Sequence, residues 1–187
     1  MKYYYLPFIP LSDVNYIYIL SLYRVAKYNN KTNLFDTIKY TSIRNLSEVL
    51  NIPYSTLSRI LNNTEYNNFI DIDKINKVII LKNNFSSKAN SRSFVRLTSE
   101  EVELIFKVND NLFSKYLIYI KYYCGYANNK SDFTAKQFLS TFGYSELSNS
   151  YISKVSLYNS ILVDNNIIEI NKYRDELGHT RNIYSVV

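Results

Sequence analysis

The first part of the chain changes between helical and extended hydrophobic patterns. In residues 12–28, apolar residues recur every three or four positions, which predicts a helix with Ser12 as its N-cap. Residues 36–40 favour a short strand. Residues 44–51 return to the helical period, with Val49 on the predicted apolar face.

A sharp turn follows this second helix. Asn51 tolerates a left-handed backbone, and Pro53 cannot continue a helix. Ser55 is the expected N-cap of a third helix, and the extended segments 69–73 and 77–81 predict a hairpin after it. This order of elements is that of the winged helix-turn-helix, in which the third helix enters the major groove of DNA.

The second half of the chain repeats this order. Residues 110–126, 133–144 and 148–165 predict three helices, and residues 167–170 and 182–187 predict the two strands of a closing hairpin. An internal repeat of this kind is a more specific signal than either copy alone.

The two halves align through the turn between their helices. Setting Phe138 on Leu46 places Gly143 on Asn51. Gly and Asn are the residue types that best tolerate a positive φ angle, so both halves are expected to turn in the same way.

We therefore predict a mainly helical α+β chain with small β-hairpins, built from two winged helix-turn-helix units in tandem. The expected domains are residues 1–82 and 99–187. Residues 83–98, which begin with a Ser- and Asn-rich stretch, are the expected linker and short strand. The low counts of Gly (3) and Pro (3) agree with a helical chain that has few tight turns.

The net charge of +6 favours polyanionic partners, and it is concentrated in the first half. Residues 1–99 hold 13 Lys and Arg against 6 Asp and Glu, whereas residues 100–187 hold 9 against 10. We expect the positive surface on the N-terminal half. A third helix that reads duplex DNA needs polar side chains for base edges and cations for phosphates.

In the first half and the linker, the expected DNA-binding residues are Arg44, Tyr54, Ser55, Thr56, Ser58, Arg59, Asn62, Asn63, Lys88 and Arg92. Arg59 is the expected contact to a guanine edge. In the second half they are Lys136, Asn149, Ser150, Ser153, Lys154, Lys172, Arg174 and Arg181, the last three in the loop of the hairpin.

Catalytic chemistry finds little support in the sequence. The chain has one histidine, His179, and one cysteine, Cys124, which lies on an apolar helix face. The pairs Asp71 with Asp73 and Asp175 with Glu176 more often form a solvated surface than a metal site. We expect no enzyme, no metal and no cofactor. The many tyrosines are expected in the core, with stacking on single strands as an alternative.

The segment IRNLSEVLNIPYSTLSRIL resembles the helix-turn-helix of bacterial winged-helix regulators. The two-unit layout is similar to tandem winged-helix replication initiators of plasmids and phages, and YLIYIKYYCGYANNKSDFTAKQFLSTFGYS resembles proteins on mobile elements of low-GC Gram-positive bacteria. The resemblance implies helices that read repeats at an origin or a promoter.

We therefore expect a cytoplasmic protein that binds double-stranded DNA at repeats, as a replication initiator or a transcription regulator, and that has no membrane segment. A homodimer and contacts with replication or transcription proteins are left open. The alternative is a protein-interaction or dimerisation module of a replication or conjugation complex, which the near-neutral second half favours. A nuclease is the third alternative.

Overall fold

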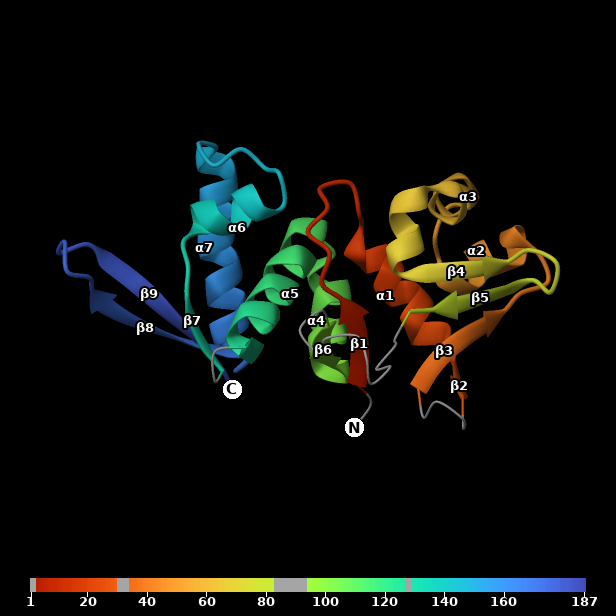
Figure 1. Cartoon of the computed structure of the whole chain (residues 1–187), viewed down its shortest axis with the longest axis horizontal. Coiled ribbons are helices and arrows are strands. Elements are labelled where there is room, and N and C mark those ends of the chain that lie inside the picture. The colour runs from red at the N-terminus through yellow and green to blue at the C-terminus, as the bar shows by residue number, and fades with distance from the viewer. Residues whose placement is uncertain (1–2, 30–33, 83–93, 127–128) are drawn as a thin grey trace.

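The computed structural model describes residues 3–29, 34–82, 94–126 and 129–187. It combines helices with three small antiparallel sheets, so the predicted α+β class is confirmed. Two β-hairpins project at opposite ends of the molecule (Figure 1). Of the helices in the described ranges, none has the length and apolar content needed to cross a bilayer.

The N-terminal half contains one helix, a helical pair and a four-stranded sheet. Its elements are α1 (Tyr16–Val25), β2 (Lys27–Asn29), β3 (Leu34–Lys39), α2 (Ile43–Leu50), α3 (Tyr54–Asn62), η1 (Thr64–Asn68), β4 (Ile70–Asp73) and β5 (Val78–Leu81). The strand order is β2-β3-β5-β4, so the second strand of the hairpin pairs with the strand that precedes the helical pair.

The C-terminal half follows the same order of elements, except that its described residues contain no counterpart of β2 or η1. They are α5 (Asn111–Tyr126), β7 (Lys130–Asp132), α6 (Ala135–Thr141), α7 (Asn149–Asp164), β8 (Ile168–Arg174) and β9 (Thr180–Val186). The strand order β7-β9-β8 again places the second hairpin strand beside the strand that precedes the helical pair. The two halves therefore share one connectivity.

The first helix of each pair ends in the same way, although the connection that follows is longer in the second half (142–148) than in the first (51–53). Asn51 has a φ angle of 53° and Gly143 one of 71°, so the expectation of positive φ at both positions is confirmed. Each turn is a Schellman motif, in which two backbone N–H groups bond back to the end of the helix. The bonds are Asn51 to Glu48 (3.2 Å), Ile52 to Ser47 (3.0 Å), Gly143 to Ser140 (2.9 Å) and Tyr144 to Leu139 (2.9 Å), each from N to O.

A central layer joins the halves. It consists of the two-stranded sheet formed by β1 (Tyr3–Pro7) and β6 (Phe94–Thr98), together with helix α4 (Ser99–Val108). The side chain of Asn111 on α5 accepts a hydrogen bond from the backbone N of Tyr16 (2.9 Å) and donates one to the carbonyl of Val14 (3.2 Å). One buried core runs through both halves.

The start of the chain thus pairs with the strand that follows residues 83–93. The division into domains 1–82 and 99–187 stays a prediction.

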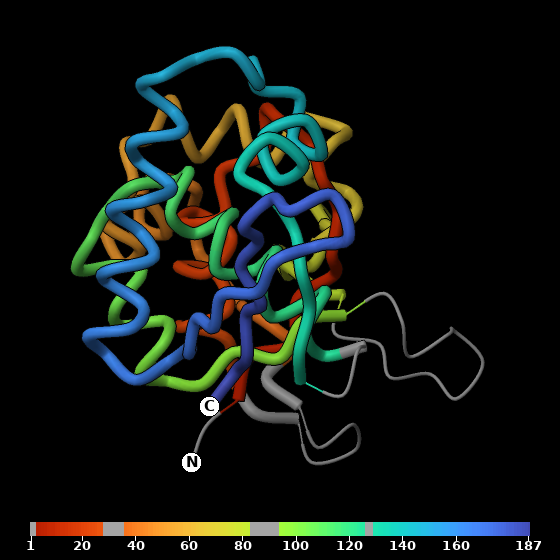
Figure 2. The backbone as a smooth tube through the Cα atoms, turned by 90° about the vertical axis from the view of Figure 1, so that its left-hand side faces the viewer, coloured from red at the N-terminus to blue at the C-terminus, as the bar shows by residue number. Residues whose placement is uncertain are grey.

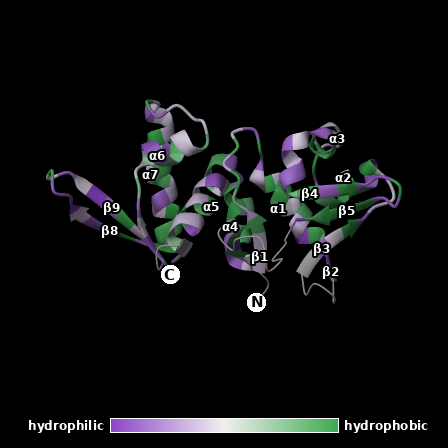
Figure 3. Cartoon of the chain, viewed as in Figure 1, coloured by the Kyte–Doolittle hydropathy of each residue, from purple (hydrophilic) through white to green (hydrophobic). Residues whose placement is uncertain are grey.

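Hydrophobic residues gather along the central helices, whereas the outer part of the β8–β9 hairpin is mainly hydrophilic (Figure 3).

Two predicted helix starts are wrong. Helix α1 begins at Tyr16, because the side chain of Asn15, not Ser12, accepts the hydrogen bond from the Ile17 backbone N–H (2.9 Å). Helix α3 begins at Tyr54 directly after Pro53, without a cap from Ser55. A proline at a helix start costs little, because the N–H groups of the first turn have no partner inside the helix.

Two further local predictions are wrong. Val49 is 59% exposed instead of lying on the buried face of α2. The C-terminal hairpin has longer strands than expected, so Lys172 and Arg174 lie in β8 and Arg181 lies in β9 rather than in the loop. Cross-strand pairing continues as far as Arg174 and Thr180, which leaves only a short turn.

Candidate nucleic-acid interface

Helix α3 presents a polar face to solvent. Leu57, Ile60 and Leu61 are buried and anchor the helix to the core. The opposite face carries four exposed side chains that the sequence singled out: Tyr54, Ser55, Arg59 and Asn62. The Schellman turn at Asn51 fixes the direction in which the chain leaves α2. Together with the buried side chains of α3, it holds the polar face in a defined orientation.

Not every predicted residue of α3 is equally available. Thr56 and Ser58 are half-buried, and the amide of Asn62 donates a hydrogen bond to the Ser58 carbonyl (2.7 Å). The side-chain oxygen of Asn63 accepts from the Glu65 backbone N–H (2.9 Å) and so caps the next helical turn. Asn63 was expected to bind DNA, but its side-chain oxygen is used to cap η1.

Two arginines give this face its charge. Arg59 is exposed on α3, and Arg44 is exposed in the first turn of α2. Within the described ranges, neither arginine forms an ion pair with a carboxylate. An unpaired arginine keeps its five donors available for a phosphate or a guanine edge.

The corresponding face of the C-terminal half is closer to neutral. The first half of α7 exposes the predicted residues Asn149, Ser150, Ser153 and Lys154. The ammonium group of Lys154, however, lies 3.0 Å from the carboxylate of Asp110, which also accepts a hydrogen bond from the Tyr158 hydroxyl (2.7 Å). Partial burial alone would raise the pKa of Asp110, but these hydrogen bonds outweigh it and lower the pKa. Lys154 therefore faces a carboxylate that stays charged.

The cations of the β8–β9 hairpin differ in whether a carboxylate already binds them. Lys172 and Arg174 are exposed on β8. Arg181 on β9 donates to Asp175 across the hairpin (2.7 Å), and this bond is the main reason that the pKa of Asp175 is lowered. Lys136 is exposed on α6. The predicted contacts Lys88 and Arg92 lie outside the described residues.

Helix α3 and the beginning of α7 lie at the same upper edge of the molecule in Figures 1 and 2. The two helices that the sequence assigned to the major groove therefore lie at one edge of the molecule. The two hairpins flank this side at its far ends (Figure 1).

The residues considered for catalysis are spread apart or engaged elsewhere. Cys124 is buried, its thiol lies 3.4 Å from the Tyr184 carbonyl, and burial raises its pKa to about 11. Asp71 pairs with Lys82 (2.9 Å), and Asp73 binds the side chain of Asn76 (2.7 Å). The described ranges hold no group of three or more His, Cys, Asp and Glu residues that is arranged to bind a metal ion.

No known protein family, curated protein or solved structure matches this chain.

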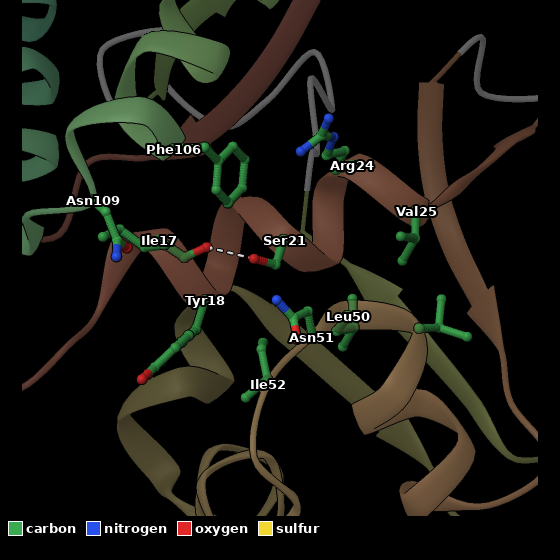
Figure 4. A pocket seen from close by; sticks show the side chains of 11 residues that line it. Ile17, Tyr18, Ser21, Arg24, Val25, Leu50, Asn51, Ile52, Phe106 and Asn109 are labelled. Carbon is green, nitrogen blue, oxygen red and sulfur yellow. Dashed lines mark hydrogen bonds between the residues drawn. The ribbon is translucent and has the colours of Figure 1, made fainter.

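A cavity that no sequence pattern indicated lies beside the α2–α3 turn (Figure 4). It has a volume of about 690 Å³ and lies between α1, this turn and α4. Arg24 borders it and is paired with Glu103 (2.9 Å), and Ser21 is bonded to the Ile17 carbonyl (2.9 Å). The lining residues are Ile17, Tyr18, Ser21, Arg24, Val25, Val49, Leu50, Asn51, Ile52, Phe106 and Asn109. Its position explains why Val49 is not covered by the core.

Proposed function

We propose that this protein binds double-stranded DNA in a sequence-specific manner, through two winged helix-turn-helix units in tandem. The observation that carries the proposal is the repeated connectivity. In both halves a helix and a strand precede a helical pair with a Schellman turn and a hairpin that completes the sheet. In this fold the second helix of the pair reads the major groove and the hairpin follows the backbone.

The exposed side chains of α3 support the same proposal. Arg59 offers a planar donor pair that matches guanine O6 and N7, and Ser55 and Asn62 offer short polar groups for other base edges. Arg44 on the neighbouring helix is suited to a phosphate. In this proposal the N-terminal unit supplies most of the affinity. A role at repeats, as replication initiator or transcription regulator of a mobile element, is the biological setting that we infer.

The experiment is a selection of bound duplexes of about 30 base pairs, nearly three helical turns, from a random pool, followed by titration of the winning sequence. Arg59→Ala is expected to weaken binding to the selected duplex about tenfold and to relax the sequence preference at the base pair that Arg59 contacts. Arg96→Ala is the matched control, because it removes an exposed arginine from strand β6. Failure to enrich any sequence would contradict the proposal.

A second candidate function concerns the C-terminal unit alone. Lys154 and Arg181 are already paired with carboxylates, which favours a protein partner or a second copy over DNA at this end. The triple variant Lys136→Ser, Lys172→Ser and Arg174→Ser removes the exposed cations that remain among its predicted contacts. If DNA affinity is unchanged in this variant while Arg44→Ser with Arg59→Ser abolishes it, the partner role is supported. An equal loss in both variants would exclude it.

A further inference from the structure

The tip of the β4–β5 hairpin holds one aliphatic side chain out in solvent. Ile75 is 93% exposed, the largest exposure among the exposed large hydrophobic residues of the described ranges. The carboxylate of Asp73 fixes the loop beneath it by accepting hydrogen bonds from the Asn76 backbone N–H (2.9 Å) and from the Asn76 side chain (2.7 Å). These two bonds are the main reason that the pKa of Asp73 is lowered. The loop is therefore built around a charged aspartate.

The tip of the β8–β9 hairpin is also a loop held by an aspartate, although it is one residue longer and Asp175 contacts other positions than Asp73 does. Leu177 is 80% exposed. The carboxylate of Asp175 accepts hydrogen bonds from the backbone N–H groups of Leu177 (3.0 Å) and His179 (2.8 Å). Both tips thus read aspartate, any residue, aliphatic residue, Asn or Gly, and then a basic residue: Asp73-Lys74-Ile75-Asn76-Lys77 and Asp175-Glu176-Leu177-Gly178-His179.

A single exposed aliphatic residue is ordinary on a protein surface. Here two of them occur at the tips of the two hairpins, each on a loop that an aspartate holds by hydrogen bonds. Each side chain is carried by a loop that loses little further freedom when it is buried against a partner, which favours binding. The tips lie at opposite ends of the molecule (Figure 1).

We propose that the two hairpin tips enter the minor groove at the two ends of the bound duplex, where Ile75 and Leu177 wedge against base steps and bend the DNA. This inference rests on the proposed DNA binding. Aliphatic wedges of this kind unstack a base step and kink the duplex. Lys74 and Lys77 flank Ile75 and can meet the adjacent phosphates. At the other tip Lys172 and Arg174 on β8 supply the cations, although the exposed Glu176 lies directly beside Leu177.

The test uses the full chain and the selected duplex with a donor and an acceptor dye at its ends. Wild-type protein is expected to raise energy transfer, because bending brings the ends closer together. Ile75→Ser with Leu177→Ser is expected to remove most of this rise and to weaken binding about tenfold, while the preference for the selected sequence over scrambled DNA remains. The exchange Ile75→Leu with Leu177→Ile is expected to bend DNA like wild type.

Val163→Ser is the matched control, because Val163 is an exposed aliphatic residue near the end of α7, away from both tips. It is expected to leave bending and affinity unchanged. Binding without bending by wild type, or equal bending by the double serine variant, would overturn the wedge and leave sequence-specific binding in place. If the wild-type chain binds no duplex at all, both the wedge and the proposed function fail.

Discussion

The buried ammonium group of Lys115 donates a hydrogen bond of 2.9 Å to the hydroxyl of Tyr144. The same ammonium group donates to the carbonyl of Ser12, so one side chain on α5 ties the start of the chain to the turn between α6 and α7. Its charge also lies over the rings of Phe142 and Tyr144. A cation at this junction stabilises the contact between the halves only as far as these partners offset its desolvation.

The stability of the protein is expected to depend on Lys115 between pH 8 and pH 10.5. Burial lowers the pKa of Lys115 to about 8, and the nearby carboxylate of Asp13 only partly opposes this. In this range the unfolded chain binds the proton and the folded chain does not, so stability rises with pH. Relative to Lys115→Met, wild type should gain on the order of 2 kcal/mol of unfolding free energy from pH 8 to pH 10. Urea unfolding at several pH values measures the difference, and parallel curves for the two proteins would contradict it.

Two glycine substitutions are expected to act in opposite directions. Gly143→Ala forces a side chain into a left-handed turn and should cost about 1 kcal/mol, although a Cβ there would have room, 3.7 Å from Ser12 Cβ. Gly125 lies near the end of α5, and a Cβ added there would have nothing within 4 Å. Gly125→Ala should therefore stabilise the folded protein by up to about 1 kcal/mol through helix propensity. Thermal unfolding compares them. Stabilisation by Gly143→Ala would show that the turn does not require its observed conformation.

Glu101 is expected to matter more to stability than Glu103 on the same helix. One oxygen of the buried Glu101 accepts from the Lys121 ammonium (2.6 Å), and the other accepts from the Thr98 backbone N–H (2.7 Å) in a capping box. Glu101→Ala should cost about 3 kcal/mol, because it leaves Lys121 without its partner. Glu103→Ala removes only an exposed pair with Arg24 and should cost less than about 1 kcal/mol.

Urea titration of the two variants measures these costs, and Glu101→Gln separates the cap from the charge. The glutamine keeps the acceptor for Thr98 and loses the ion pair. Its cost should therefore lie between zero and that of Glu101→Ala. Equal costs for Glu101→Ala and Glu103→Ala would contradict the importance of burial at this pair.

The salt dependence of DNA binding is expected to report which cations contact phosphate. Removal of an arginine that binds a phosphate lowers the slope of log K against log salt by about one. Arg44→Ser should show this change. Lys154→Ser should change the slope by less, because Asp110 already neutralises Lys154 in the free protein. Fluorescence anisotropy at several salt concentrations measures both slopes, and a larger change for Lys154→Ser would reverse the proposed order of the two units.

Much of the local structure was predictable from the sequence. The helical periods, the positive φ angles at Asn51 and Gly143, and the hairpins at 69–81 and 167–187 all depend on neighbouring residues. Local backbone preferences and the spacing of apolar residues decide such features within a few positions along the chain. The errors at the helix starts are also local: Asn15 rather than Ser12 caps α1, and α3 begins directly after Pro53 without a side-chain cap.

The sequence by itself determined the main helices, the two hairpins and the residue types on the polar face of α3, but it did not indicate strands β1 and β7. Only the tertiary structure decided that β1 pairs with β6, that Lys154 meets Asp110, and that Val49 borders a cavity. Each of these depends on segments far apart along the chain that meet once the core is closed. No local pattern encodes that meeting, because the free energy of a contact between distant residues depends on how everything between them has packed.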